Sequence, residues 1–108
     1  MKLDIDNAVF RVFEARARPG KLELLRQKFA TTSVAVVNGE PGNIGYLFGE
    51  PVSSQQDNLI FVSVWESLDA IQGRFGPAWQ QSFLPEGYDD LIEECSVRHF
   101  RFDGEIAA

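Results

Sequence analysis

The run NLIFVSVW at residues 58–65 constrains the fold of this chain more than any other stretch of its sequence. A strand with one face in water alternates apolar and polar residues, whereas this one is apolar at nearly every position. Its side chains would divide between the two faces of a sheet, with Ile60, Val62 and Val64 on one face and Leu59, Phe61 and Trp65 on the other. Both faces of this strand therefore need a cover.

Four strands are expected along the chain. Each is bounded by turn residues and is rich in apolar or β-branched side chains. They are predicted over 8–18, 43–50, 58–65 and 95–102. Two helices separate the first strand from the second and the third from the fourth, which gives the order β-α-β-β-α-β.

The helices are predicted from apolar spacing. Leu22, Leu25, Phe29 and Val36 follow three-and-four spacing and indicate one long helix. A shorter helix followed by an extended piece is the alternative, since TTSVAVV at 31–37 is rich in residues with weak helix propensity. The second helix follows Ser67, which can cap it, and buries Leu68, Ile71 and Phe75. Two short helical turns are expected at 78–83 and 88–94.

This order is that of a ferredoxin-like α+β fold, in which an antiparallel four-stranded sheet carries both helices on one face. We expect a single domain over 1–108, with its core at about 8–103. Phe10 and Val12 add to the second face, which would be a larger apolar patch than a soluble monomer usually exposes. The simplest cover is a second copy of the chain, so a homodimer through the sheet face is predicted.

Composition excludes several classes of function. The net charge is −6, from 10 Lys and Arg against 16 Asp and Glu, which disfavours nucleic acid and anionic membranes as partners. No apolar run approaches the roughly 20 residues of a membrane span, and no signal peptide is recognisable. One Cys, Cys95, and one His, His99, form no zinc-type cluster, and no dinucleotide or phosphate loop is present. We expect a cytoplasmic protein with no metal and no cofactor.

Four stretches of the sequence resemble the antibiotic biosynthesis monooxygenase (ABM) group of the dimeric α/β-barrel superfamily. They are ARPGKLELL, GEPGNIGYLFGEP, FVSVWESLDAI and CSVRHFRF, and they span about residues 9–102. The resemblance implies a homodimer whose two sheets form a barrel, with a small-molecule pocket in each protomer between sheet and helices. The stretch from Gly76 to Glu94 departs from the family pattern and would shape the mouth of that pocket.

His99 and Trp65 are the predicted catalytic residues. His99 is the only imidazole in the chain and the natural general base near neutral pH, although a hydrogen-bonded structural histidine is the plainer interpretation. Its ring points either into the barrel or toward the helices. Trp65 holds the strand-end position of the VWES pattern, which by resemblance lines the pocket, and its indole N–H could orient a polar oxygen of the ligand.

Five further residues are predicted to bind the substrate: Phe61, Ser63, Tyr46, Glu14 and Phe10. Phe61 and Ser63 share the face of Trp65, and Tyr46 could donate a hydrogen bond to a phenolic or quinone oxygen. Glu14 and Phe10 lie on the second face of the first strand. The plainer interpretations are packing for the aromatic residues and a solvated strand-end charge for Glu14.

The leading functional hypothesis is a cofactor-independent monooxygenase, with molecular oxygen as co-substrate and a small phenol or hydroquinone as substrate. A pocket that deprotonates such a ring yields an anion electron-rich enough to reduce oxygen. A non-catalytic dimeric small-molecule-binding or stress-related protein is the alternative. A haem-degrading oxygenase, with His99 as the only imidazole ligand, is a further alternative.

Overall fold

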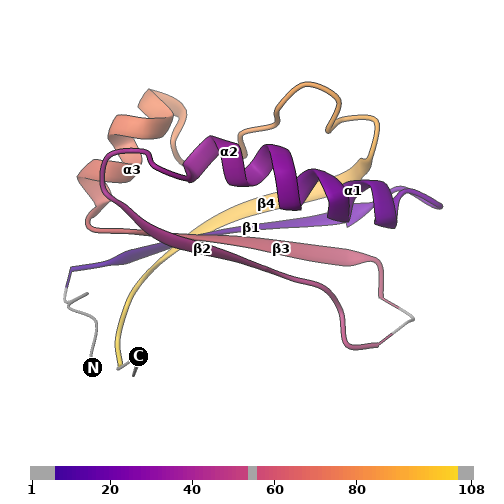
Figure 1. The fold of residues 1–108 in the computed structure, drawn as a ribbon, viewed down its shortest axis with the longest axis horizontal. Helices are drawn as coiled ribbons and strands as arrows, with labels where there is room; N and C mark the ends of the chain where they lie inside the picture. Colours follow the sequence, from indigo (N-terminus) through magenta and orange to yellow (C-terminus); the bar gives the residue numbers. More distant parts are fainter. Residues whose placement is uncertain (1–6, 54–55, 105–108) are drawn as a thin grey trace.

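The computed structural model describes residues 7–53 and 56–104 and shows one sheet carrying helices on one side (Figure 1). The elements in chain order are β1 (Val9–Ala17), α1 (Leu22–Lys28), the π-helix η1 (Phe29–Ser33), α2 (Val34–Val37), β2 (Asn43–Gly49), β3 (Asn58–Trp65), α3 (Leu68–Phe75), the 3-10 helix η2 (Gly76–Ala78) and β4 (Ile92–Arg101). The predicted ferredoxin-like α+β class is confirmed. Within the described ranges, no helix is long and apolar enough to cross a membrane.

The four strands form one antiparallel sheet in the order β2-β3-β1-β4. The cross-strand pairs Phe13–Phe61 and Arg11–Ser63 fix which side chains share a face. Because side chains alternate along a strand, this register places Leu59, Phe61, Ser63 and Trp65 toward the helices, where all four are buried. The division of β3 between two faces is therefore the predicted one.

The first helical stretch runs without a break from Leu22 to Val37, so the long helix is confirmed and the extended alternative is wrong. Its middle turn, Phe29–Ser33, widens into a π-helix. The hydroxyl of Thr31 donates to the carbonyl of Gln27 at 2.9 Å, and such side-chain bonds compete with regular helical pairing. Leu25 and Phe29 anchor the helix by burial against the sheet.

The second helix, α3, begins as predicted. The hydroxyl of Ser67 accepts from the backbone N–H of Ala70 at 3.2 Å, and Gly76, with φ of 72°, ends the helix. Ile71 is fully buried, but Leu68 is 37% exposed, so its predicted burial is wrong. Leu68 lies in the first turn of α3 and is not part of the buried core cluster.

The stretch after η2 differs from the prediction. Residues 79–91 form an irregular loop of turns over the helix side of the sheet, and the last three residues of the second expected helical turn, 92–94, belong to β4. Ile92 pairs with Ala17 across a bulge in the β1–β4 ladder, and this pairing extends the strand backward. The loop is held down by Tyr88, which is 1% exposed.

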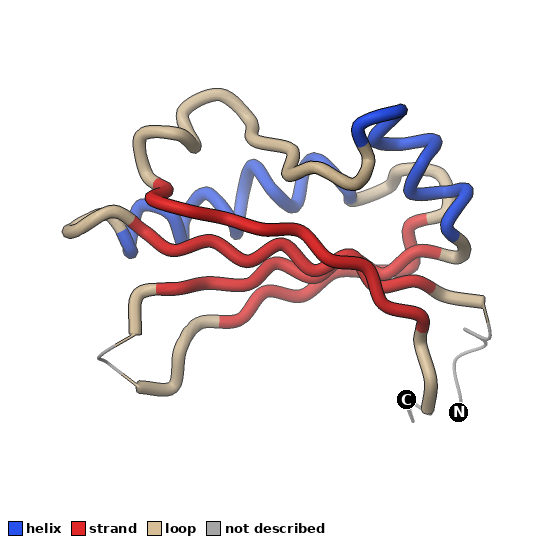
Figure 2. The backbone as a smooth tube through the Cα atoms, turned by 180° about the vertical axis from the view of Figure 1, so that it is seen from behind, coloured by secondary structure: helices blue, strands red, loops and turns tan. Residues whose placement is uncertain are grey.

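The opposite face of the sheet carries no helix or second sheet from the described residues (Figure 2). Ile60, Val62 and Val64 point to it and are partly exposed, and Leu47 and Phe100 there are 55% and 48% exposed. We call this surface the open face. The core of the protomer lies wholly on the other side, between the sheet and the helices.

Candidate functional site

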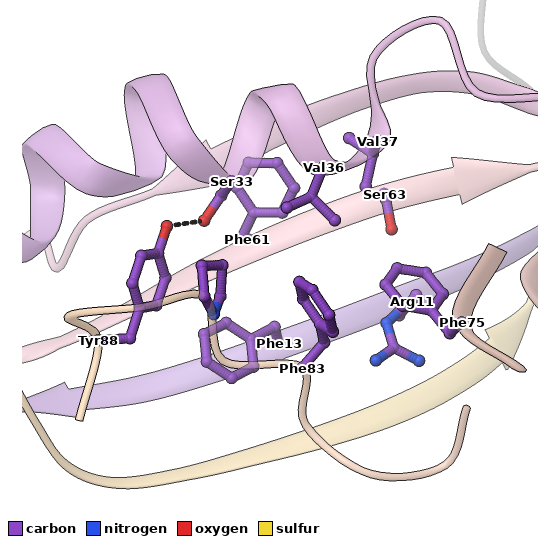
Figure 3. Close-up of a pocket in the computed structure, with 11 residues that line it drawn as sticks. Arg11, Phe13, Ser33, Val36, Val37, Phe61, Ser63, Phe75, Phe83 and Tyr88 are labelled. Atoms are coloured by element: carbon purple, nitrogen blue, oxygen red, sulfur yellow. Dashed lines mark hydrogen bonds between the residues drawn. The ribbon is translucent and has the colours of Figure 1, made fainter. Parts of the chain in front are cut away.

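A cavity of about 40 Å³ lies between the sheet and the helices, on the same side as the loop after α3 (Figure 3). Its wall is aromatic, with Phe13 and Phe61 from the sheet, Phe75 from α3 and Phe83 from the loop. Four polar side chains also reach it: Arg11, Ser63, Ser33 and Tyr88. An apolar cavity with a few convergent polar groups is the usual form of a small-molecule site.

Arg11 is the only charged residue of the cavity wall, and it is 5% exposed. Its Nη1 donates to the carbonyl of Trp79 and approaches Nε2 of His99 at 3.0 Å, and its Nη2 donates to the carbonyl of Gln81 at 3.0 Å. The guanidinium lies 3.9 Å from the centre of the Phe75 ring. Burial lowers the pKa of Arg11 to about 10, so it stays charged at neutral pH.

His99 lies beside Arg11 on β4, with its ring toward the helix side of the sheet. Its ring centre is 4.9 Å from that of Trp79, in an edge-to-face arrangement. Because a guanidinium only donates hydrogen bonds, Nε2 of His99 must be the acceptor in its contact with Arg11. Burial, and then repulsion from Arg11, lower the pKa of His99, so the ring is neutral at pH 7.

Trp65 is fully buried and supports the cavity from behind. Its indole N–H donates to the hydroxyl of Ser63 at 2.8 Å, and Ser63 is the residue of this pair that lines the cavity. The ring of Trp65 packs edge-to-face on Phe75 at 5.9 Å. The indole donor is thus already used, and it fixes the orientation of the Ser63 hydroxyl.

The π-helix supplies the polar group at the other end of the cavity. Ser33 and the phenol of Tyr88 are 2.6 Å apart, and Tyr88 also donates to the carbonyl of Lys28 at 3.1 Å (Figure 3). Since the single phenolic proton goes to that carbonyl, the hydroxyl of Ser33 donates to Tyr88. Burial raises the pKa of Tyr88. π-Helical turns occur often at functional sites, and here one brings Ser33 to the cavity.

The cavity is smaller than a ligand site of ordinary size. Small-molecule pockets enclose about 300–1,000 Å³, so an aromatic ligand must displace part of the wall. The loop residue Phe83 is the side chain best able to move, because it is 46% exposed and packs edge-to-face on Phe75 at 6.0 Å. The loop over 79–91 is therefore the part of the cavity wall that packs least tightly.

Residues 8–82 match the sequence model of the family described as antibiotic biosynthesis monooxygenase. The chain belongs to the ABM family. A search of curated proteins found no match to this ABM-family chain.

Solved structures show the same fold over more than nine-tenths of the chain. PA3566 from Pseudomonas aeruginosa is 15% identical with a TM-score of 0.71, and the match covers 94% of this chain and 100% of that one. SnoaB from Streptomyces nogalater, a cofactor-independent oxygenase, is 18% identical with a TM-score of 0.63, covering 91% and 93%. A MhuD variant with two manganese protoporphyrin IX molecules bound per active site is 23% identical with a TM-score of 0.68, covering 93% and 99%.

The structure brings together some of the residues predicted from the sequence and separates others. Phe61 and Ser63 line the cavity, whereas Trp65 and His99 stand directly behind its polar wall. Tyr46 is 40% exposed on the edge strand β2 and stacks on Phe61, with ring centres 6.1 Å apart.

Phe10 and Glu14 lie on the open face, away from the cavity. Glu14 accepts from the side chain of Asn58 at 2.8 Å and from Arg98 at 3.3 Å. Phe10 packs on Phe102. Neither residue can contact a ligand held between sheet and helices in the same protomer.

The sequence patterns do not identify Arg11, Ser33 and Tyr88 as site residues. For Arg11 a signal was present, because it shares its face of β1 with Phe13, Ala15 and Ala17, and a charged residue on a buried face is unusual. Ser33 falls within the apolar spacing of the first helix, which indicates burial only. Its place in the site depends on its hydrogen bond with Tyr88, which no sequence pattern indicates. Tyr88 lies in a stretch without periodicity, so no pattern placed it.

The residues present do not fit haem. His99 is the only imidazole of the chain, and its Nε2 accepts a hydrogen bond from Arg11. The cavity of about 40 Å³ is also far too small for a porphyrin. Ligation by His99 would require both the loss of the Arg11 contact and a large opening of the core.

The lowered pKa of His99 predicts how stability depends on pH. In the folded protein the His99 ring stays neutral at pH values somewhat below 6.5, the ordinary pKa of histidine. Between pH 6.5 and the lowered pKa of the folded state, the folded protein therefore binds fewer protons than the unfolded chain, and its stability falls as the pH falls. The contribution of His99 to the free energy of unfolding is fully present above pH 6.5 and is lost as the pH falls toward that lower pKa. Urea unfolding at pH 7.5 and 5.5 should therefore show a smaller loss of stability in His99→Gln than in the wild type. Equal losses in the two proteins would contradict this.

Proposed function

We propose that this protein is a cofactor-independent monooxygenase that oxidises a small phenol or hydroquinone in the cavity between sheet and helices. The observation that carries the proposal is an aromatic-walled cavity with a cation at one end and a neutral imidazole directly behind that cation, in a chain of the ABM family. SnoaB, which has the same fold, is a cofactor-independent oxygenase. An apolar enclosure, a base and the exclusion of water are the groups that such a reaction requires.

The reaction balances without an external reductant. A phenol with a free ring position loses its hydroxyl proton, and the phenolate passes electrons to O₂. One oxygen atom bonds to the ring carbon and the other leaves as water, so phenol and O₂ give quinone and water. The substrate supplies all four electrons.

His99 is the proposed proton acceptor. Its pKa is lowered, so it is neutral at pH 7, and it can take the proton once the hydrogen bond from Arg11 to its Nε2 breaks. A proton on His99 beside the Arg11 cation is unfavourable unless a new anion forms nearby, and the phenolate is that anion. Trp65 would act through Ser63, whose hydroxyl it orients toward the cavity.

Oxygen uptake tests the function directly. We expect the wild type to consume one O₂ per quinone formed from at least one member of a panel of phenols and hydroquinones, with one atom of ¹⁸O₂ retained in the product. His99→Gln should lower turnover at least tenfold while melting at nearly the same temperature. No uptake across the panel, with ligand-induced rises in Tm, would instead favour a non-catalytic small-molecule-binding protein.

We also propose that two copies associate through the open face. This face presents apolar side chains from all four strands, including Val12, Val62, Leu47 and Phe100. Soluble monomers rarely leave so continuous an apolar surface in water. A second copy related by two-fold symmetry covers the whole patch at once.

A further inference from the structure

We propose that the cavity binds its ligand through an anionic oxygen, a carboxylate or a phenolate, held by the guanidinium of Arg11. The ligand class is thus an aromatic acid, with its ring among the aromatic side chains and its charge at Arg11. This inference rests on the proposed use of the cavity as a ligand site, but it does not require turnover.

The first observation is that Arg11 is a buried cation with no acidic side chain beside it among the residues that the structure describes. In the described part of the chain its partners are two backbone carbonyls, one imidazole and one aromatic ring, all of them neutral. A buried charge is costly unless an opposite charge compensates it. Arg16, Arg26, Arg74 and Arg98 each lie within 4.0 Å of a carboxylate, whereas Arg11 has no carboxylate within that distance among residues 7–53 and 56–104.

The second observation concerns the free donors of the guanidinium. Nη1 uses its two protons on Trp79 and His99, and Nη2 uses one on Gln81. The Nε proton and one Nη2 proton have no acceptor among the described residues. Every fully buried side-chain nitrogen and oxygen there has a partner, so Nε must be accessible from the cavity or from solvent. Two donors on adjacent nitrogens suit a carboxylate, which arginine binds in a bidentate manner.

The third observation is that the guanidinium is held in place before a ligand arrives. The carbonyls of Trp79 and Gln81 fix one side of it and the ring of Phe75 covers a face. Fixed donors aimed into a water-poor space stabilise an anion more than donors on a mobile surface side chain do. The same cation would also hold a phenolate formed during the proposed reaction.

Ligand binding tests the inference with matched acids and amides. Titration calorimetry would compare benzoate with benzamide and 1-naphthoate with 1-naphthamide, at equal ionic strength. In the wild type we expect at least one acid to bind at least tenfold more tightly than its amide. Arg11→Gln should abolish this preference and Arg11→Lys should restore part of it, because lysine keeps the charge. Arg26→Gln is the control, since it removes the same charge from the surface near Glu23 and should leave the preference unchanged.

A bound phenolate, unlike a bound carboxylate, has a spectroscopic signature of its own. If Arg11 holds a phenolate, 1-naphthol bound to the wild type should show the naphtholate absorption band at a pH below its solution pKa, and Arg11→Gln should not show it. An inference of anion binding is overturned if neither acid is preferred and no naphtholate band forms. A preference for the acids without oxygen uptake by any phenol would support the anion site and refute the oxygenase. Oxygen uptake without a preference for the acids would support the oxygenase and refute the anion site.

Discussion

Replacing Gly42 with alanine is expected to lower the free energy of unfolding by about 2–5 kcal/mol. Gly42 has φ of 82°, which costs alanine about 1–2 kcal/mol. A Cβ added there would also overlap the Cβ of Ala70 on α3, because the turn before β2 packs directly on that helix. The carbonyl of Gly42 accepts from the backbone N–H of Glu66 at 2.8 Å, so the turn cannot move away from α3 without losing this hydrogen bond. Urea unfolding followed by circular dichroism measures the change.

Two further variants separate backbone strain from the overlap. Gly39→Ala has a similar φ of 78° but no atom within 4 Å of the added Cβ, so it should cost only the backbone share, about 1–2 kcal/mol. Adding Ala70→Gly to Gly42→Ala should recover stability beyond the sum of the single changes, with a coupling of about 1–3 kcal/mol. Equal losses at positions 39 and 42, or no coupling with position 70, would show that the close packing of turn on helix is wrong.

The sheet was predictable because alternation along a strand is a local property. Side-chain alternation along the apolar strand 58–65 predicted Leu59, Phe61 and Trp65 on one face and Ile60, Val62 and Val64 on the other. Apolar spacing from Leu22 onward likewise predicted the long helix. The π-helical turn at Phe29–Ser33 was not predictable, since it depends on a local hydrogen bond of Thr31 and on packing against the sheet.

The site was predictable only where it lies on the strands. Alternation on β3 puts Phe61 and Ser63 on the helix side of the sheet, where both line the cavity, and the same alternation on β1 points Arg11 to that side. The loop over 79–91 has no apolar period, so its path is set by distant contacts, chiefly the burial of Tyr88 against the π-helix. For Trp65, the family resemblance pointed to the pocket, but the structure shows the indole N–H engaged by Ser63.

Replacing Val62 with aspartate is expected to convert the proposed dimer into monomers. Val62 lies on β3 between Val12 and Leu47, its cross-strand neighbours, at the middle of the open face. Two-fold pairing of this face would bury a carboxylate from each copy, at a cost of several kcal/mol. An increase in the dimer Kd on the order of a thousandfold follows from that cost.

Sedimentation velocity at micromolar concentration distinguishes the two states. The wild type should sediment near 24 kDa, twice the 12.1 kDa of one chain, and Val62→Asp near the mass of one chain. Val52→Asp is the matched control, because Val52 is fully exposed in a loop and the same change there should leave the dimer intact. The open face points away from the cavity, so a folded Val62→Asp monomer should keep the acid preference attributed to Arg11. A wild type that remains at 12.1 kDa would show that water, and not a second copy, covers this face.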